Sequence, residues 1–124
     1  MPIAQSRGDV FDALVLQAVD HLQPRLADQL ARIEFAVEDV PDIGRADDPL
    51  LDDDTLEDHA VPLSRVFRSG VADISGPVIV LYRRPLEARA GRREDLAGLV
   101  HDVVVEQVAR LLGRSVDDID PPLS

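Results

Sequence analysis

The chain has 124 residues, a length that suits one domain with its own hydrophobic core. Aromatic residues make up only 3% of it, so the core is expected to consist of Leu, Val, Ile and Ala. The absence of cysteine excludes disulfides, thiolate metal sites and a cysteine nucleophile. The formal net charge of −11 disfavours nucleic acids and anionic membranes as partners, because both would repel the chain.

The N-terminal third is predicted to be helical. Residues 1–8 are expected to form a loose tail, followed by Asp9 as the N-cap of a helix over Val10–Leu22. Apolar residues recur there at three- and four-residue steps, which indicates one buried face. Gln23-Pro24 interrupts the pattern, and a second short helix over Pro24–Leu30 is expected because proline suits a first helical position.

The middle of the chain predicts strands and one long acidic loop. Ile33, Phe35 and Val37 alternate with polar residues, as in a half-buried strand. Residues 41–60 are rich in Asp and resist burial, so we expect an exposed acidic loop with a short helical turn near Leu56. Residues 61–68 fit a short strand or edge segment. Residues 78–82 are five apolar residues in a row, which is typical of a central strand covered on both faces.

A long C-terminal helix is predicted over Asp95–Leu112, with Gly113 just beyond its end. Gln107 falls on its apolar face, where a buried amide needs hydrogen-bond partners. Ser115, with Asp118 three residues later, fits the cap of one last helical turn, and residues 121–124 are expected to form a loose tail. The opposite face of the long helix collects its charged residues, which are Asp95, Asp102, Glu106 and Arg110.

The order of these segments resembles a family of small bacterial zincin-like metallopeptidases, the minimal zincins. The resemblance covers roughly residues 10–120, and its most specific part is Leu-Tyr-Arg-Arg-Pro-Leu at residues 81–86, just upstream of the long helix. It implies a single α+β zincin-like domain over residues 1–124. A small mixed sheet would pack against N-terminal helices and a long C-terminal helix that carries the active site in the family.

The family's HExxH motif, which supplies two zinc ligands and a general base, is absent from this sequence. When Gly113 is matched to the glycine that follows the motif, Glu106 and Arg110 stand at the ligand positions and Gln107 at the base position. Arginine does not bind zinc, and an amide does not accept a proton as a carboxylate does. The acidic third ligand would align near Val116, next to Asp117. The resemblance therefore implies a catalytically inactive domain without zinc, which acts as a binding or scaffold protein.

An alternative from a different class is a metal-dependent hydrolase with a relocated site at His101, Asp102 and Glu106. Asp102 and Glu106 are i, i+4 neighbours on one helix face, but Glu106 is equally placed to pair with Arg110. Zinc would be the cofactor of this alternative alone.

Partners are expected to be a peptide or protein in the former substrate groove, and neither nucleic acid nor membrane. The basic residues Arg83, Arg84, Arg89, Arg92 and Arg93 either balance the acidic segment 47–58 or hold an acidic ligand. The start of the chain lacks the apolar run of a signal peptide, so a cytoplasmic location is expected.

Overall fold

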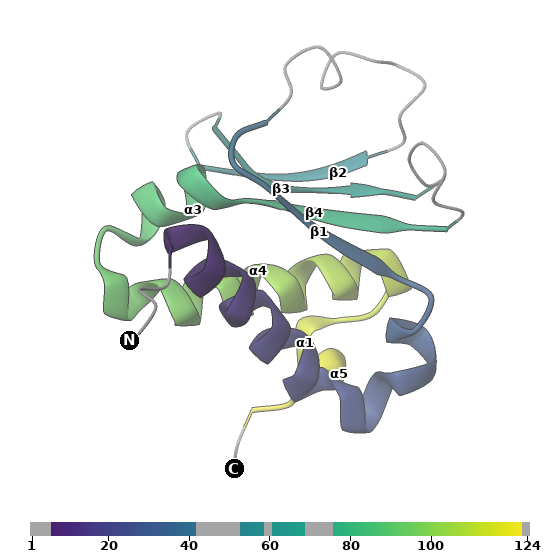
Figure 1. The fold of residues 1–124 in the computed structure, drawn as a ribbon. Coiled ribbons are helices and arrows are strands. Elements are labelled where there is room, and N and C mark those ends of the chain that lie inside the picture. The colour runs from purple at the N-terminus through teal and green to yellow at the C-terminus, as the bar shows by residue number, and fades with distance from the viewer. Residues whose placement is uncertain (1–5, 42–52, 59–60, 69–75, 123–124) are drawn as a thin grey trace.

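A four-stranded mixed sheet with helices against one of its faces forms the fold (Figure 1). The computed structural model describes residues 6–41, 53–58, 61–68 and 76–122. The strands lie in the order β1-β4-β3-β2. They are β1 (Glu34–Glu38), β2 (Asp53–Asp58), β3 (Val61–Phe67) and β4 (Val78–Tyr82). β1 runs parallel to β4, whereas β3 is antiparallel to both β4 and β2. This architecture confirms the predicted α+β class.

The described helices are α1 (Arg7–Leu30), α3 (Arg83–Ala90), α4 (Arg93–Leu112) and α5 (Val116–Ile119). α1 and α4 pack against each other beneath the sheet, with α5 beside the C-terminal part of α4 (Figure 1). None of the helices in the described ranges has the length and apolar character needed to cross a membrane.

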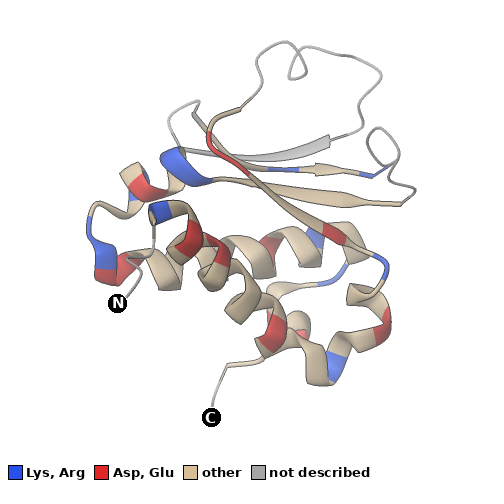
Figure 2. Ribbon diagram, in the orientation of Figure 1, with Lys and Arg blue, Asp and Glu red and all other residues tan. Residues whose placement is uncertain are grey.

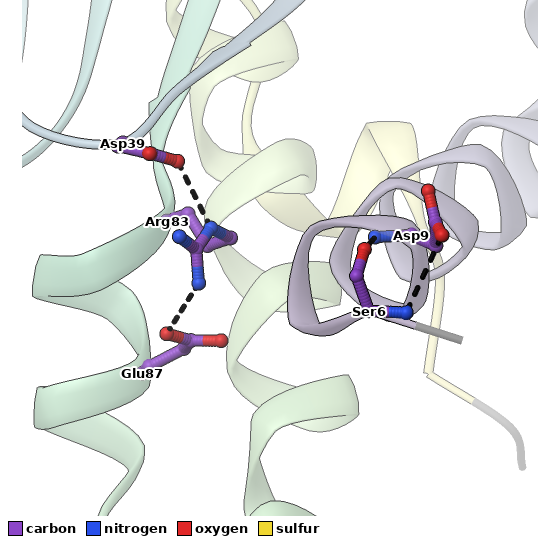
Figure 3. A network of polar contacts seen from close by, with 5 residues as sticks. All are labelled: Ser6, Asp9, Asp39, Arg83 and Glu87. Atoms are coloured by element: carbon purple, nitrogen blue, oxygen red, sulfur yellow. Dashed lines mark hydrogen bonds and ion pairs between the residues drawn. The ribbon is translucent and has the colours of Figure 1, made fainter. Parts of the chain in front are cut away.

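Helix α1 begins earlier than its predicted start. Ser6, and not Asp9, is the N-cap: its hydroxyl accepts a hydrogen bond from the Asp9 backbone N–H at 3.0 Å, and the Asp9 carboxylate accepts one from the Ser6 N–H at 3.3 Å (Figure 3). This reciprocal capping box satisfies two N–H groups that the first turn would otherwise leave unpaired. Residues 6–8 are therefore ordered parts of the helix and its cap, contrary to the predicted tail, while residues 1–5 lie outside the described part.

The predicted break at Gln23-Pro24 takes the form of a kink inside α1. Pro24 lies within the helix, and Leu26 has the non-helical angles φ −129° and ψ 24°. Proline lacks the N–H that would continue the helical ladder, so the chain bends and then resumes its helical course. Both halves bury one stripe, which consists of Phe11, Val15, Ala18, Leu22, Leu26 and Leu30.

Strand β2 corrects the prediction of an acidic loop with a helical turn near Leu56. Asp53–Asp58 instead pairs antiparallel with β3. Within the described residues β2 forms an edge of the sheet, a position where charged residues are common in proteins. The sequence reasoning weighed the acidic composition and missed the backbone pairing. Residues 42–52 and 59–60 of the predicted loop lie outside the described part.

β3 and β4 form the buried centre of the sheet. All five residues of β4 are buried, as the apolar run predicts. Ile79 and Leu81 face α1 and α4, whereas Val78, Val80 and Tyr82 belong to a second cluster with Phe67. β3 is an inner strand and not an edge, because β2 pairs with its outer side.

The β2–β3 pairing contains a bulge that affects which side chains of β3 face the helices. Leu56 pairs with Ser64, but Glu57 pairs with Pro62, so Leu63 is an extra residue. Such an insertion changes the alternation of side chains along the strand. Leu63 and Val66 both join the core cluster that α4 shares, and Ser64 is fully buried.

The long helix agrees with its prediction to within two residues. α4 starts at Arg93, ends at Leu112 and is followed by Gly113 in the left-handed conformation, with φ 67° and ψ 35°. Ser115 caps α5 by accepting a hydrogen bond from the Asp118 N–H, as predicted.

We expect Ser6→Ala to lower the free energy of unfolding by about 1 kcal/mol, because the capping box is lost while no core contact changes. Urea unfolding followed by circular dichroism measures this difference. Ser6→Asp serves as the matched control, since aspartate also caps helices and should restore most of the stability. An alanine variant as stable as the parent would show that the capping box contributes nothing.

Candidate functional site

Gln107 is a fully buried amide on α4, with an exposed fraction of 0%. Its Nε2 donates a hydrogen bond to Ser64 Oγ on β3 at 2.7 Å, and Ser64 is also 0% exposed. The bulge beside Leu63 lies next to Ser64 in β3, and the helical period turns Gln107 toward the sheet. The sequence predicted that this amide needs a buried partner, and the structure supplies the hydroxyl of Ser64.

Glu106 and Arg110 form an ion pair one helical turn apart. Arg110 Nη2 lies 3.2 Å from Glu106 Oε1, and the two side chains are 40% and 46% exposed. A pair this exposed contributes only a few tenths of a kcal/mol to stability. Each group partly neutralises the charge of the other, so the Glu106 carboxylate already has a cationic partner. Val116 and Asp117, near the expected third ligand, are exposed residues of α5.

His101 is directed away from the other two residues of the alternative site. Asp102 is exposed and Glu106 pairs with Arg110, whereas the imidazole of His101 is paired with a different carboxylate. Its Nε2 lies instead 2.7 Å from Asp120 Oδ2, at the end of α5. His101 and Glu106 are five residues apart, which places them about 140° apart around the helix.

His101 belongs to a cluster of three residues from three helical segments. His21 on α1 places its Nε2 3.0 Å from Asp120 Oδ1, and the two imidazole rings meet edge to face with centroids 5.1 Å apart. Hydrogen bonding from His101, and then from His21, lowers the pKa of Asp120 below its ordinary value although partial burial opposes this. Asp120 is therefore a carboxylate under neutral conditions, with one oxygen toward each imidazole.

Sequence reasoning missed His21 and Asp120 as members of one cluster. They lie in different predicted segments, and Asp120 was placed next to a loose tail. Only the packing of α1 and α5 against α4 brings them together, and no motif spacing encodes it. The one available signal was the pair of histidines on two amphipathic helices expected to pack together.

Of the predicted basic group, Arg92 and Arg93 line one hollow, and Arg83 and Arg84 line a second one. Figure 2 shows basic residues at the beginnings of α1, α3 and α4. Arg83 is largely neutralised there: its Nε lies 3.0 Å from Asp39 Oδ1 and its Nη1 lies 3.0 Å from Glu87 Oε1 (Figure 3). The Asp39 hydrogen bond is the main cause of the raised pKa of Arg83. Asp39 directly follows β1 and Glu87 belongs to α3, so Arg83 ties the end of β1 to α3. Of the acidic segment 47–58 that was expected to balance these arginines, residues 47–52 lie outside the described part and residues 53–58 form β2.

The chain was compared with known proteins. A family model described as a zincin-like metallopeptidase matches residues 30–122, which include the whole sheet and the helices α3, α4 and α5. No curated protein matches the chain. Because the match covers well over half of the 124 residues, the chain belongs to the zincin-like metallopeptidase family.

Proposed function

We propose that this protein is a catalytically inactive zincin-like domain that works as a binding or scaffold protein. The observation that carries the proposal is the environment of Gln107. This residue stands at the base position of the family motif when Gly113 is aligned with the glycine after HExxH. Its amide is 0% exposed and is hydrogen-bonded to Ser64, so it has neither the proton affinity nor the access to water that a general base requires.

The two ligand positions support the same conclusion. Glu106 is held by Arg110, and a permanently cationic guanidinium beside a carboxylate repels a divalent ion. A zincin mechanism needs a metal that activates water together with a base that accepts its proton. Both elements are replaced in the same helical turn, so one substitution alone would not restore the chemistry.

A binding role is supported by the open edge of the sheet. In the described residues β2 is an edge strand, and α4 contacts both β2 and β3. An edge strand presents backbone N–H and C=O groups that an extended peptide can pair with, which is also how a peptidase of this architecture would hold a substrate. Four of the six residues of β2 are acidic, and the whole chain is acidic, so the preferred peptide carries positive charge.

The purified full chain is expected to show no chelator-sensitive cleavage of a mixed peptide library, measured by mass spectrometry of the products. The physical reason is the absence of both a metal-activated water and a base at the family position. An active zincin peptidase run in parallel establishes that the library contains cleavable peptides. Cleavage that disappears with a chelator and with Glu106→Ala would overturn the proposal.

Gln107→Glu, which restores a carboxylate at the base position, is expected to destabilise the fold on the order of 3 kcal/mol near pH 7 and to leave the protein inactive. Burial raises the pKa of the new carboxyl above its unfolded value of about 4.3. The penalty is therefore absent below about pH 4 and grows as the pH rises above the unfolded pKa.

Urea unfolding at pH values near 4 and near 7 measures this difference. Gln17→Glu makes the same chemical change at an exposed position of α1 and provides the matched control, with a change within about 0.5 kcal/mol. If Gln107→Glu were as stable as the control at neutral pH, the position would be accessible to water, and the main support for inactivity would be lost.

The edge-strand role predicts which peptide the protein selects. A labelled peptide of alternating lysine and valine should bind more tightly than its glutamate counterpart, and binding should weaken with added salt. In an NMR titration of the full chain, the amide signals of Asp53–Asp58 should shift while those of the exposed face of α1 stay in place. Equal binding of both peptides, or shifts confined to β1, would contradict this prediction.

A further inference from the structure

We propose that His21, His101 and Asp120 form a zinc-binding site that is separate from the family's catalytic position. Two imidazole nitrogens and one carboxylate are a donor set that suits Zn²⁺. The ligand atoms of the three residues all lie within 4.8 Å of one another. Among the described residues, these three side chains converge closely enough to hold one ion.

The two separations between an imidazole nitrogen and a carboxylate oxygen are somewhat shorter than those of a tetrahedral zinc site. Zinc bonds of about 2.0–2.2 Å place neighbouring ligand atoms roughly 3.3–3.6 Å apart. The two Nε2–carboxylate distances are 3.0 and 2.7 Å, with one imidazole on each oxygen. An ion at this cluster therefore requires the Nε2 and carboxylate oxygen atoms to separate by less than about 1 Å.

The backbone positions are fixed independently of any metal. His21 precedes the buried Leu22 on α1, and His101 follows the buried Val100 on α4. Asp120 follows Ile119, which is 0% exposed, and its own N–H donates to the Val116 carbonyl at 2.8 Å. Each proposed ligand is thus adjacent to a core residue. The conformational entropy lost when the three segments come together is therefore offset by the free energy of folding, and metal binding does not have to supply it.

Zinc binding requires a change in the protons of the two imidazoles. Without metal, each Nε2 faces a carboxylate oxygen and carries the proton of that hydrogen bond. With Zn²⁺ bound, both Nε2 atoms donate their lone pairs to the ion, and each neutral ring keeps its proton on Nδ1.

The site would remain open on one side. The His21 side chain is 57% exposed, so water or a further ligand can take the fourth position. His21 also lies outside the residues 30–122 that the family model matches, and His101 projects from a different side of α4 than Glu106. A metal at this cluster would link α1, α4 and α5 without contributing to catalysis at the family position.

Titration of ZnCl₂ into the metal-free full chain, followed by isothermal titration calorimetry, tests the proposal. We expect one equivalent to bind, and His21→Gln and Asp120→Asn each to weaken binding at least about 10-fold. The matched controls are Asp117→Asn on the same short helix, His59→Gln as the third histidine of the chain, and Glu106→Gln at the family position. Each control should retain affinity within about twofold of the parent.

One further measurement, and the exposure of His21, keep the test decisive. ¹⁵N NMR of the imidazoles should show the proton move from Nε2 to Nδ1 on His21 and His101 when zinc is added. Because His21 is exposed, His21→Gln should fold like the parent, and its result stands even if Asp120→Asn does not fold. Absence of saturable binding, or binding that Glu106→Gln or His59→Gln abolishes while His21→Gln does not, would overturn the proposal.

Discussion

Burial of helix α4 on several sides is the constraint on which the structure depends. Its buried positions span Leu96 to Ala109 and include three consecutive valines, Val103–Val105, so more than one face of the helix is covered. β3 covers one side, α1 another and α5 a third. Any polar group on these sides must find its partner inside the protein, because water is excluded. Gln107 meets this requirement through Ser64, and the charged residues of α4 are restricted to the strip that remains exposed.

This arrangement explains how the family fold can persist without the family motif. The core is built from aliphatic side chains of α1, α4 and the two inner strands, and none of its contacts needs a metal. In our proposal the motif positions include Glu106 and Arg110, which lie on the exposed strip, where a substitution has little effect on stability. A motif position on the covered side cannot change as freely. In our proposal Gln107 occupies such a covered position, because burying an uncharged amide costs much less free energy than burying a carboxylate.

The sequence was most informative where one local rule decides the structure. The extent of α4 follows from its apolar period and from Gly113, and β4 follows from an uninterrupted apolar run. Prediction was poorer where two rules compete. Ser6 and Asp9 are both good caps, and only the geometry shows that Ser6 is the cap and that Asp9 completes the box. The acidic composition of β2 concealed its pairing with β3.

The candidate sites also differ in how far they could be predicted from the sequence. The burial of Gln107 and the pairing of Glu106 with Arg110 follow from helical periodicity, so both could be anticipated. The identity of the buried partner, Ser64, depends on a bulge in a strand 43 positions away, which no local pattern reveals. The histidine–aspartate cluster depends on how three helices pack, and helix packing angles are not encoded in a short motif.

The parallel pairing of β1 with β4 has a consequence for the order of folding. Glu34 pairs with Val78, and β2 and β3 both lie between these strands in the sequence. The antiparallel pairs β2–β3 and β3–β4 join strands that are consecutive in the sequence. The pairing of β1 with β4 closes a much longer loop of the chain, so it is expected to form later. During synthesis, β1 therefore emerges well before its partner exists. Phe35 and Val37 of β1 therefore lack their partner strand during that interval.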